Sequence, residues 1–174
     1  PLGDCWCKNL DFVIKKRKIN KKKKYRFKLN SNFEYIISNC AKNRSKDKDT
    51  WINDCIINTY IQMNKLGYAH SVECWNDNKL IGGLYGVHIK GCFFGESMFS
   101  KISNASKLCL LFLVSILIKY DYLLLDSQFY NPHLVQFGAY EILDDDYQNK
   151  LKIALAKNCT FPGKITYSES VSIL

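Results

Sequence analysis

The chain has 174 residues, of which 47% are hydrophobic, and a formal net charge of +9. This composition excludes a wholly disordered chain and fits a single domain with a buried core. Eight cysteines without a C-x-x-C pair and three dispersed histidines argue against a zinc site. Several cysteines fall in apolar runs, which suits core residues in a reducing, cytoplasmic compartment.

The positive charge is concentrated in one segment, residues 15–28, which holds ten of the 25 Lys and Arg residues and no acid. The rest of the chain therefore has 15 basic against 16 acidic residues. Such a block attracts the phosphates of RNA by counterion release, whereas the alternative is a solvated lysine tract. The residues that we expect to contact RNA are Lys15, Lys16, Arg17, Lys18, Lys21, Lys22, Lys23 and Lys24.

The first half of the chain predicts three strands and two helices. Alternating apolar and polar residues indicate strands, and a shared apolar face indicates a helix. Ser31 or Asn32 can cap the first helix, Thr50 can cap the second, and the turn at 76–78 joins two strands. The expected elements are a strand at 25–29, a helix to residue 40, a helix over 51–66 that ends at Gly67, and strands at 69–75 and 79–87.

The second half predicts helices around a buried strand. The longest apolar run, residues 108–118, is too short to span a bilayer and predicts a buried helix. The expected elements are a strand at 92–94, a helix from 104 or 106 through 119, a strand at 122–126, a helix beginning within 134–137 and a helix over 144–157. Strands in the middle with helices before and after predict a mixed α/β (α+β) sheet flanked by helices.

Two polar residues, Asp126 and Gln128, follow the apolar run Leu123 to Leu125. In an extended chain, a spacing of two places both side chains on one face. Open α/β sheets form their clefts where buried strands end, so a carboxylate there could orient the Gln128 amide or relay a proton. The alternative is that Asp126 only caps the strand.

Residues that are unusual in a sheet lie within the predicted strand at 79–87 and just after the one at 92–94. Glu96 follows an apolar strand, and a carboxylate there is costly to bury unpaired. It should meet a cation, a hydroxyl or a substrate amine, or else bond the neighbouring backbone. Gly82, Gly83 and Gly86 indicate either the close approach of a ligand or a β-bulge.

Consecutive blocks of the sequence follow a characteristic order: Thr50-Trp51-Ile52, Leu66 to Glu73, Gly82 to Gly86, Gly95 to Ser100, Asn104 to Lys107, Asp126 to Gln128 and Gly138 to Ile142. In this order they resemble the catalytic domain of the leucyl/phenylalanyl-tRNA–protein transferase family. The resemblance covers residues 51–147 well and 15–41 loosely. It implies a fold like that of Gcn5-related acetyltransferases, with residues 1–14 as an N-terminal remnant and 15–174 as one transferase domain.

The resemblance also implies a reaction. The enzyme would move Leu, Phe or Met from a charged tRNA to the N-terminal α-amine of an acceptor protein, by aminolysis of the ester. This reaction tags proteins for degradation in an N-degron pathway. The implied acceptors begin with Arg or Lys, and we expect a monomer in the cytoplasm that needs no membrane, metal or cofactor.

Residue roles follow from the same resemblance. Asp126 and Gln128 would be catalytic, with Asp126 holding and polarising Gln128. Glu96 and Asn131 would fix the substrate, and Trp51 would stack near the tRNA 3′ end. The walls of the pocket for the transferred side chain would be Leu84, Phe93, Leu110, Leu113 and Leu117. From the residues alone, an apolar stripe of this kind belongs to the core by default.

The sequence departs from the family pattern in three ways. Members carry a smaller N-terminal domain before this region, which we expect this sequence to lack. Asn131-Pro132-His133 replaces Asn-Asp-His, and Leu113 and Leu117 stand where the family has Phe. Two other functions therefore remain open. One is a non-catalytic RNA-binding module on the same fold, and the other is an acyl-CoA-dependent N-acyltransferase.

Overall fold

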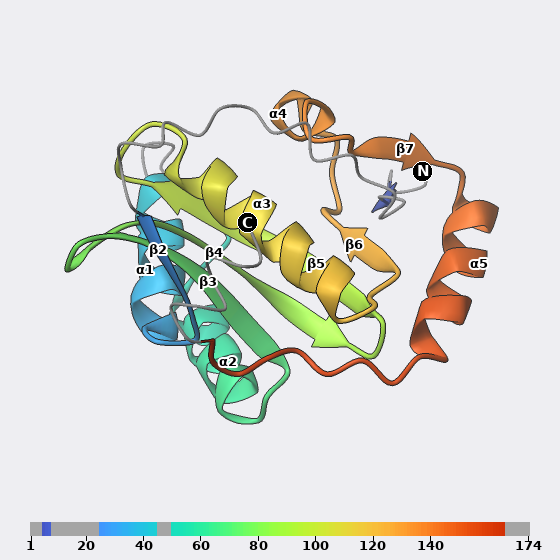
Figure 1. Ribbon diagram of the computed structural model, residues 1–174, viewed down its shortest axis with the longest axis horizontal. Helices are drawn as coiled ribbons and strands as arrows, with labels where there is room; N and C mark the ends of the chain where they lie inside the picture. The colour runs from blue at the N-terminus through green and yellow to red at the C-terminus, as the bar shows by residue number, and fades with distance from the viewer. Residues whose placement is uncertain (1–4, 8–24, 45–49, 166–174) are drawn as a thin grey trace.

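The computed structural model of the chain describes residues 5–7, 25–44 and 50–165 (Figure 1). Its strands form one seven-stranded sheet in the order β2-β3-β4-β5-β6-β1-β7. The strands are β1 (Cys5–Cys7), β2 (Tyr25–Leu29), β3 (Ala69–Asn76), β4 (Lys79–Ile89), β5 (Cys92–Ser100), β6 (Leu124–Asp126) and β7 (Tyr140–Ile142). The helices are α1 (Phe33–Arg44), α2 (Asp54–Lys65), α3 (Ala105–Lys119), α4 (Pro132–Val135) and α5 (Asp144–Leu155).

The predicted mixed α/β class is confirmed, as are the five elements expected in the first half and the helix after β5. Two short strands were not predicted. One of them, β1, pairs antiparallel with both β6 and β7, so Cys5–Cys7 belong to the sheet although they precede position 15. β5 extends beyond the predicted strand at 92–94 to Ser100, and this extension carries much of the site described below.

The predicted start of the second helix at Trp51 was wrong. The Asn53 side chain accepts the backbone N–H of Ile56 at 3.0 Å and caps α2, which therefore begins at Asp54. Thr50, the predicted cap, accepts the N–H of Ile52 at 3.2 Å. Trp51 consequently lies in the loop before the helix, where 42% of its surface is exposed.

Helices cover both faces of the sheet (Figure 1). α3 packs on one face, where Phe112 stacks on Phe27 of β2 with ring centroids 4.6 Å apart. α1 and α2 pack on the other face, where Ile36 and Tyr85 are fully buried. Because side chains alternate along each strand, successive residues of β3 and β4 pack into the core on one face of the sheet and then into the core on the other.

The glycines of β4 are explained by packing. A Cβ on Gly82 would lie 2.6 Å from Cβ of Ala105 in α3, and one on Gly83 would lie 2.4 Å from Cδ1 of Ile36 in α1. Gly86 lies at a β-bulge, where a Cβ would lie 2.2 Å from the carbonyl oxygen of Phe94. The sequence predicted either a ligand or a β-bulge near these glycines. At Gly86 the structure has the bulge.

β5 and β6 run parallel and pair over three positions only. The pairs are Cys92 with Leu124, Phe93 with Leu125 and Phe94 with Asp126. Beyond Phe94 the two strands separate, while β5 continues along β4 to Ser100. The sheet is therefore forked at this point. None of the helices in the described part of the chain has both the length and the apolarity to cross a membrane.

His70 of β3 is buried against Phe161, with ring centroids 4.4 Å apart. Its Nδ1 lies 3.1 Å from Nδ2 of Asn30. Burial, together with the nearby His88, lowers the pKa of His70 to about 4. The imidazole is therefore neutral in the folded protein near pH 7.

We predict that Gly86→Ala destabilises the protein by about 1–3 kcal/mol, because the new methyl group clashes with backbone. Gly163→Ala is the matched control, since a Cβ there meets nothing within 4 Å, and should change stability by less than about 0.5 kcal/mol. Urea unfolding measures both. Equal stabilities for the two variants would contradict the packing at the bulge.

We predict that acid lowers stability through His70. Unfolded His70 takes up a proton near pH 6.5, whereas the folded side chain stays neutral down to about pH 4. Stability should therefore fall by about 1.4 kcal/mol per pH unit over this window, about 3 kcal/mol in all. His70→Gln should flatten the profile of unfolding free energy against pH in that window. An unchanged slope in the variant would contradict the burial of a neutral His70.

Candidate functional site

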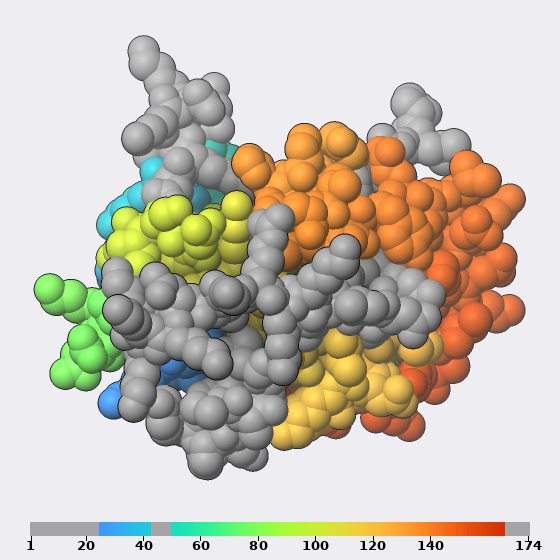
Figure 2. Space-filling model, turned by 45° about the horizontal axis from the view of Figure 1, so that its top comes forward, coloured from blue at the N-terminus to red at the C-terminus, as the bar shows by residue number. Residues whose placement is uncertain are grey.

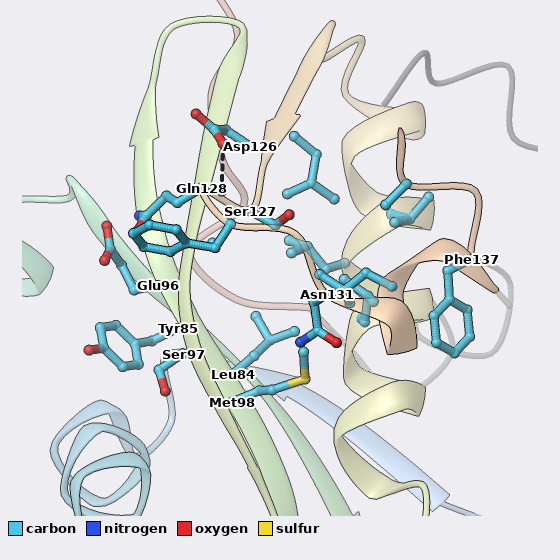
Figure 3. Close-up of a pocket in the computed structure, with 18 of the residues that line it drawn as sticks. Leu84, Tyr85, Glu96, Ser97, Met98, Asp126, Ser127, Gln128, Asn131 and Phe137 are labelled. Atoms are coloured by element: carbon cyan, nitrogen blue, oxygen red, sulfur yellow. Dashed lines mark hydrogen bonds between the residues drawn. The ribbon is translucent and has the colours of Figure 1, made fainter. Parts of the chain in front are cut away.

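A cavity of about 390 Å³ lies where β5 and β6 separate (Figure 3). Strands β4 and β5, the end of β6, helix α3 and the segment around α4 all contribute to its lining. In the space-filling view, the surface around α4 (orange) adjoins that of the end of β5 and the loop that follows it (yellow-green) (Figure 2). The site thus lies between the separated parts of β5 and β6. The three paired positions of these strands close one end of this gap.

Asp126 is the last residue of β6 and is 4% exposed. Its Oδ1 accepts the backbone N–H of Gln128 at 2.7 Å, and its Oδ2 accepts the hydroxyl of Tyr147 in α5 at 2.8 Å. Hydrogen bonds to both oxygens offset the cost of burying this carboxylate. Asp126 therefore holds Gln128 through its backbone.

Gln128 lies in a tight turn with strained backbone geometry. Its φ is +67°, and the N–H of Phe129 donates to the carbonyl oxygen of Ser127 at 2.8 Å. This i to i+2 hydrogen bond around a residue of positive φ defines a rare γ-turn. Strain of this kind persists only where the surrounding structure imposes it. Here the Asp126 carboxylate imposes it by binding the N–H of Gln128. The turn aims the Gln128 side chain across the cavity toward Glu96 (Figure 3).

Glu96 is the extra residue of a β-bulge in β5. Tyr85 pairs with Ser97 and Gly86 pairs with Gly95, so Glu96 has no partner on β4. Glu96, Tyr85 and Ser97 lie on one side of the strand, whereas Leu84 and Met98 lie on the other (Figure 3). The bulge therefore turns a carboxylate toward the cavity without placing it in the core around α3.

Burial raises the pKa of Glu96, and the negative charge of Asp126 acts in the same direction. Hydrogen bonding with the Gln128 amide and the Tyr60 hydroxyl acts in the opposite direction. Burial also raises the pKa of Tyr60, and the nearby Glu96 raises it further. Glu96 thus faces a hydroxyl and an amide, which are partners of the kind expected for a carboxylate beside an apolar strand.

The opposite side of the cavity is apolar. Leu84 and Met98 of the sheet, Leu110 and Leu113 of α3, and Phe137 line it. Leu84 and Met98 lie side by side in Figure 3, with Phe137 apart from them. Apolar walls exclude charged side chains because a charge would lose its hydration there. The cavity therefore has a polar half beside Glu96 and Gln128 and an apolar half beside α3.

Eight of the predicted site residues line this cavity. They are Asp126, Gln128, Glu96, Asn131, Trp51, Leu84, Leu110 and Leu113. Phe93 and Leu117 do not, because both are fully buried in the core around α3. Asn131 also caps α4, since its side chain accepts the N–H of His133 at 2.9 Å. The predicted RNA contacts from Lys15 to Lys24 lie outside the described residues.

The sequence analysis gave no role in the site to several other lining residues, although some of them lie in the blocks that carry the resemblance. Leu134 and Phe137 come from the segment around α4. Their apolar spacing was the only sequence signal for this segment, and it indicated a helix without indicating a cavity. Tyr85 comes from β4, where it pairs with Ser97, and Ser97 and Met98 come from the extension of β5 beyond the predicted strand. The remaining ones are Gly95, Val114, Leu125, Ser127, Phe129, Tyr130 and Ala139.

The donors of the cavity suit an organic substrate. Within the described part of the chain, no three His, Cys, Asp or Glu residues lie close enough together to hold a metal ion. The polar half offers a carboxylate and a primary amide, and the apolar half offers space for an uncharged side chain. This combination can bind an aminoacyl group and orient an attacking amine beside it.

We predict that Gln128→Gly gives a more stable protein than Gln128→Ala by about 1 kcal/mol. Both changes remove the amide, but only glycine adopts a φ of +67° without strain. Urea unfolding of the pair measures the difference. An alanine variant as stable as the glycine variant would contradict the strained turn.

The chain is similar in sequence to proteins of one known family. The model of the family described as leucyl/phenylalanyl-tRNA protein transferase matches residues 7–152. Three curated relatives bear the name leucyl/phenylalanyl-tRNA–protein transferase. The protein from Hyphomonas neptunium is 46% identical over 139 residues, that from Chlorobaculum tepidum is 46% identical over 145, and that from Zymomonas mobilis is 50% identical over 128.

These matches cover most of this chain but less of the relatives. They include 80%, 83% and 74% of the chain, and 54%, 75% and 48% of the three relatives in the same order. The chain thus spans about half the length of two of them. The matched range takes in the whole cavity, from Trp51 to Ala139. By sequence and by the extent of the match, this chain belongs to the leucyl/phenylalanyl-tRNA–protein transferase family.

Proposed function

We propose that this chain transfers an aminoacyl group from a charged tRNA to the N-terminal α-amine of a protein. The observation that carries the proposal is the pairing, in one cavity, of an apolar half with the Asp126–Gln128 turn. The apolar half suits the side chain of Leu, Phe or Met, as the relatives' name suggests for the first two. Gln128 stands at the boundary of the two halves, where the ester carbonyl would lie.

The reaction needs orientation and charge stabilisation more than an activated group. The amine nitrogen attacks the carbonyl carbon, the C–O bond to the ribose breaks, and the ribose oxygen takes a proton that the amine gives up. The Gln128 amide oxygen accepts a hydrogen bond from the attacking amine and aligns its lone pair. The carboxylates of Glu96 and Asp126 favour the positive charge that develops on the nitrogen.

Finer features of this function belong to the proposal as well. Acceptors beginning with Arg or Lys suit a cavity whose polar half holds two carboxylates, Glu96 and Asp126. Trp51, partly exposed at the cavity, offers a face on which the terminal base of the tRNA stacks. The basic segment at 15–24 supplies the contacts to tRNA phosphates. We propose a monomer acting in the cytoplasm in the tagging of proteins for degradation.

We predict that Asp126→Asn lowers the rate of transfer about 100-fold or more, because it removes the charge that holds Gln128 and faces the amine. The assay follows radiolabelled Phe or Leu from charged tRNA to a protein beginning with Arg. Asp121→Asn is the matched control, since Asp121 precedes β6, pairs with Lys157 at the surface and does not line the cavity.

The two variants and the wild-type chain separate the hypotheses. Loss of transfer in Asp126→Asn, with tRNA affinity and Asp121→Asn activity retained, supports the proposed role. Full transfer by Asp126→Asn would contradict it. A wild-type chain that binds tRNA but transfers nothing would instead favour the RNA-binding module.

A further inference from the structure

Two exposed aromatic residues at the cavity have no part in the reaction described above. Phe129 is 74% exposed and Tyr130 is 55% exposed, and both line the cavity. Large aromatic side chains exposed beside a binding cavity mark an interaction surface rather than a core. Unlike Trp51, which precedes α2, they come from the loop between β6 and α4.

The backbone of this pair is anchored on both sides. On one side, the N–H of Phe129 closes the γ-turn with the carbonyl oxygen of Ser127. On the other, the side chain of Asn131 caps α4 by accepting the N–H of His133. An anchored backbone loses little conformational freedom on binding, so it presents the two rings as a platform beside the cavity.

The position of the platform limits what can reach it. This inference rests on the proposed function, in which the cavity holds the aminoacyl group. The terminal nucleotide of the tRNA must then lie at the mouth of the cavity. The unpaired nucleotides before it must then run over the rim. Bases of single-stranded RNA stack on aromatic side chains whatever their identity, because every base has a π-face. We propose that Phe129 and Tyr130 form a stacking platform for the unpaired bases that precede the terminal adenosine of the donor tRNA.

This assignment favours RNA over the acceptor protein. The polar half of the cavity, with Glu96 and Gln128, suits an amine, whereas these two rings present flat apolar surface. An acceptor that varies in sequence after its first residue offers no constant group for them. The C-C-A end of a tRNA always offers two cytosines.

The test uses three donors that carry the same amino acid: charged tRNA, aminoacyl C-C-A trinucleotide and aminoacyl adenosine. Phe129→Ala and Tyr130→Ala should raise the KM for the tRNA and the trinucleotide about 10-fold, the effect of losing one stacked base. The KM for aminoacyl adenosine should not change, which also shows that the variants fold. Tyr130→Phe, which keeps the ring, should behave as wild type.

Three results would overturn the platform. One is an unchanged KM for all donors. The second is an equal rise for aminoacyl adenosine, and the third is a rise in the KM of the acceptor protein in place of the donor. The last result would assign the rings to the acceptor.

A second measurement does not depend on transfer. Phe129→Trp places a fluorescent ring on the platform, and uncharged C-C-A trinucleotide should quench it beyond the signal of the wild-type chain. Tyr68→Trp is the control, because Tyr68 is 54% exposed and does not line the cavity. Quenching without transfer would support the platform while the proposed function fails, whereas no added quenching overturns the platform.

Discussion

The buried carboxylate of Asp126 ties together the parts of the structure on which the site depends. One oxygen accepts the backbone N–H of Gln128 and the other accepts the hydroxyl of Tyr147. Hydrogen bonds to a charged group contribute about 1.5–3 kcal/mol each, and leaving such a charge unpaired costs more. The end of β6, the γ-turn and helix α5 are therefore fixed to one another through a single side chain.

The separation of β5 and β6 opens the cavity beside the Asp126 carboxylate. β6 pairs with β5 as far as Phe94 and Asp126 and then leaves it, so the rest of β5 has an open edge. A bulge at Glu96 then directs polar groups to one side of β5, while Leu84 and Met98 keep to the other. The cavity can thus receive an apolar side chain and an amine at adjacent places. That arrangement is what aminolysis of an aminoacyl ester requires.

Local chemistry explains which parts of the fold could be predicted. The strand at 25–29 follows from alternation, and the β3–β4 hairpin follows from turn residues between two apolar runs. β1 and β7 have three residues each and depend on pairing with distant strands, which local patterns do not reveal. The start of α2 was missed because Thr50 and Asn53 are both good caps, and the structure uses the second.

Chemistry and spacing singled out Asp126, Gln128 and Glu96, and the structure brings all three to one cavity, while their roles stay predictions. The apolar wall was harder, because periodicity marks the buried face of α3 without saying which part of it faces a cavity. Leu113 lines the cavity, whereas Leu117, one turn further along the helix, lies wholly in the core. The γ-turn at Gln128 is set by tertiary contacts and has no local signal, whereas the bulge at Glu96 was signalled only by Gly86 on the strand opposite.

A crystal structure of this chain with an aminoacyl adenosine in which an amide replaces the ester would show directly how the cavity holds the aminoacyl group. We expect the amino acid side chain to lie between Leu84, Leu110 and Leu113. We also expect the carbonyl group to lie within hydrogen-bonding reach of the turn at Gln128. An analogue bound outside the fork of β5 and β6, or one with its side chain in the polar half, would contradict this arrangement.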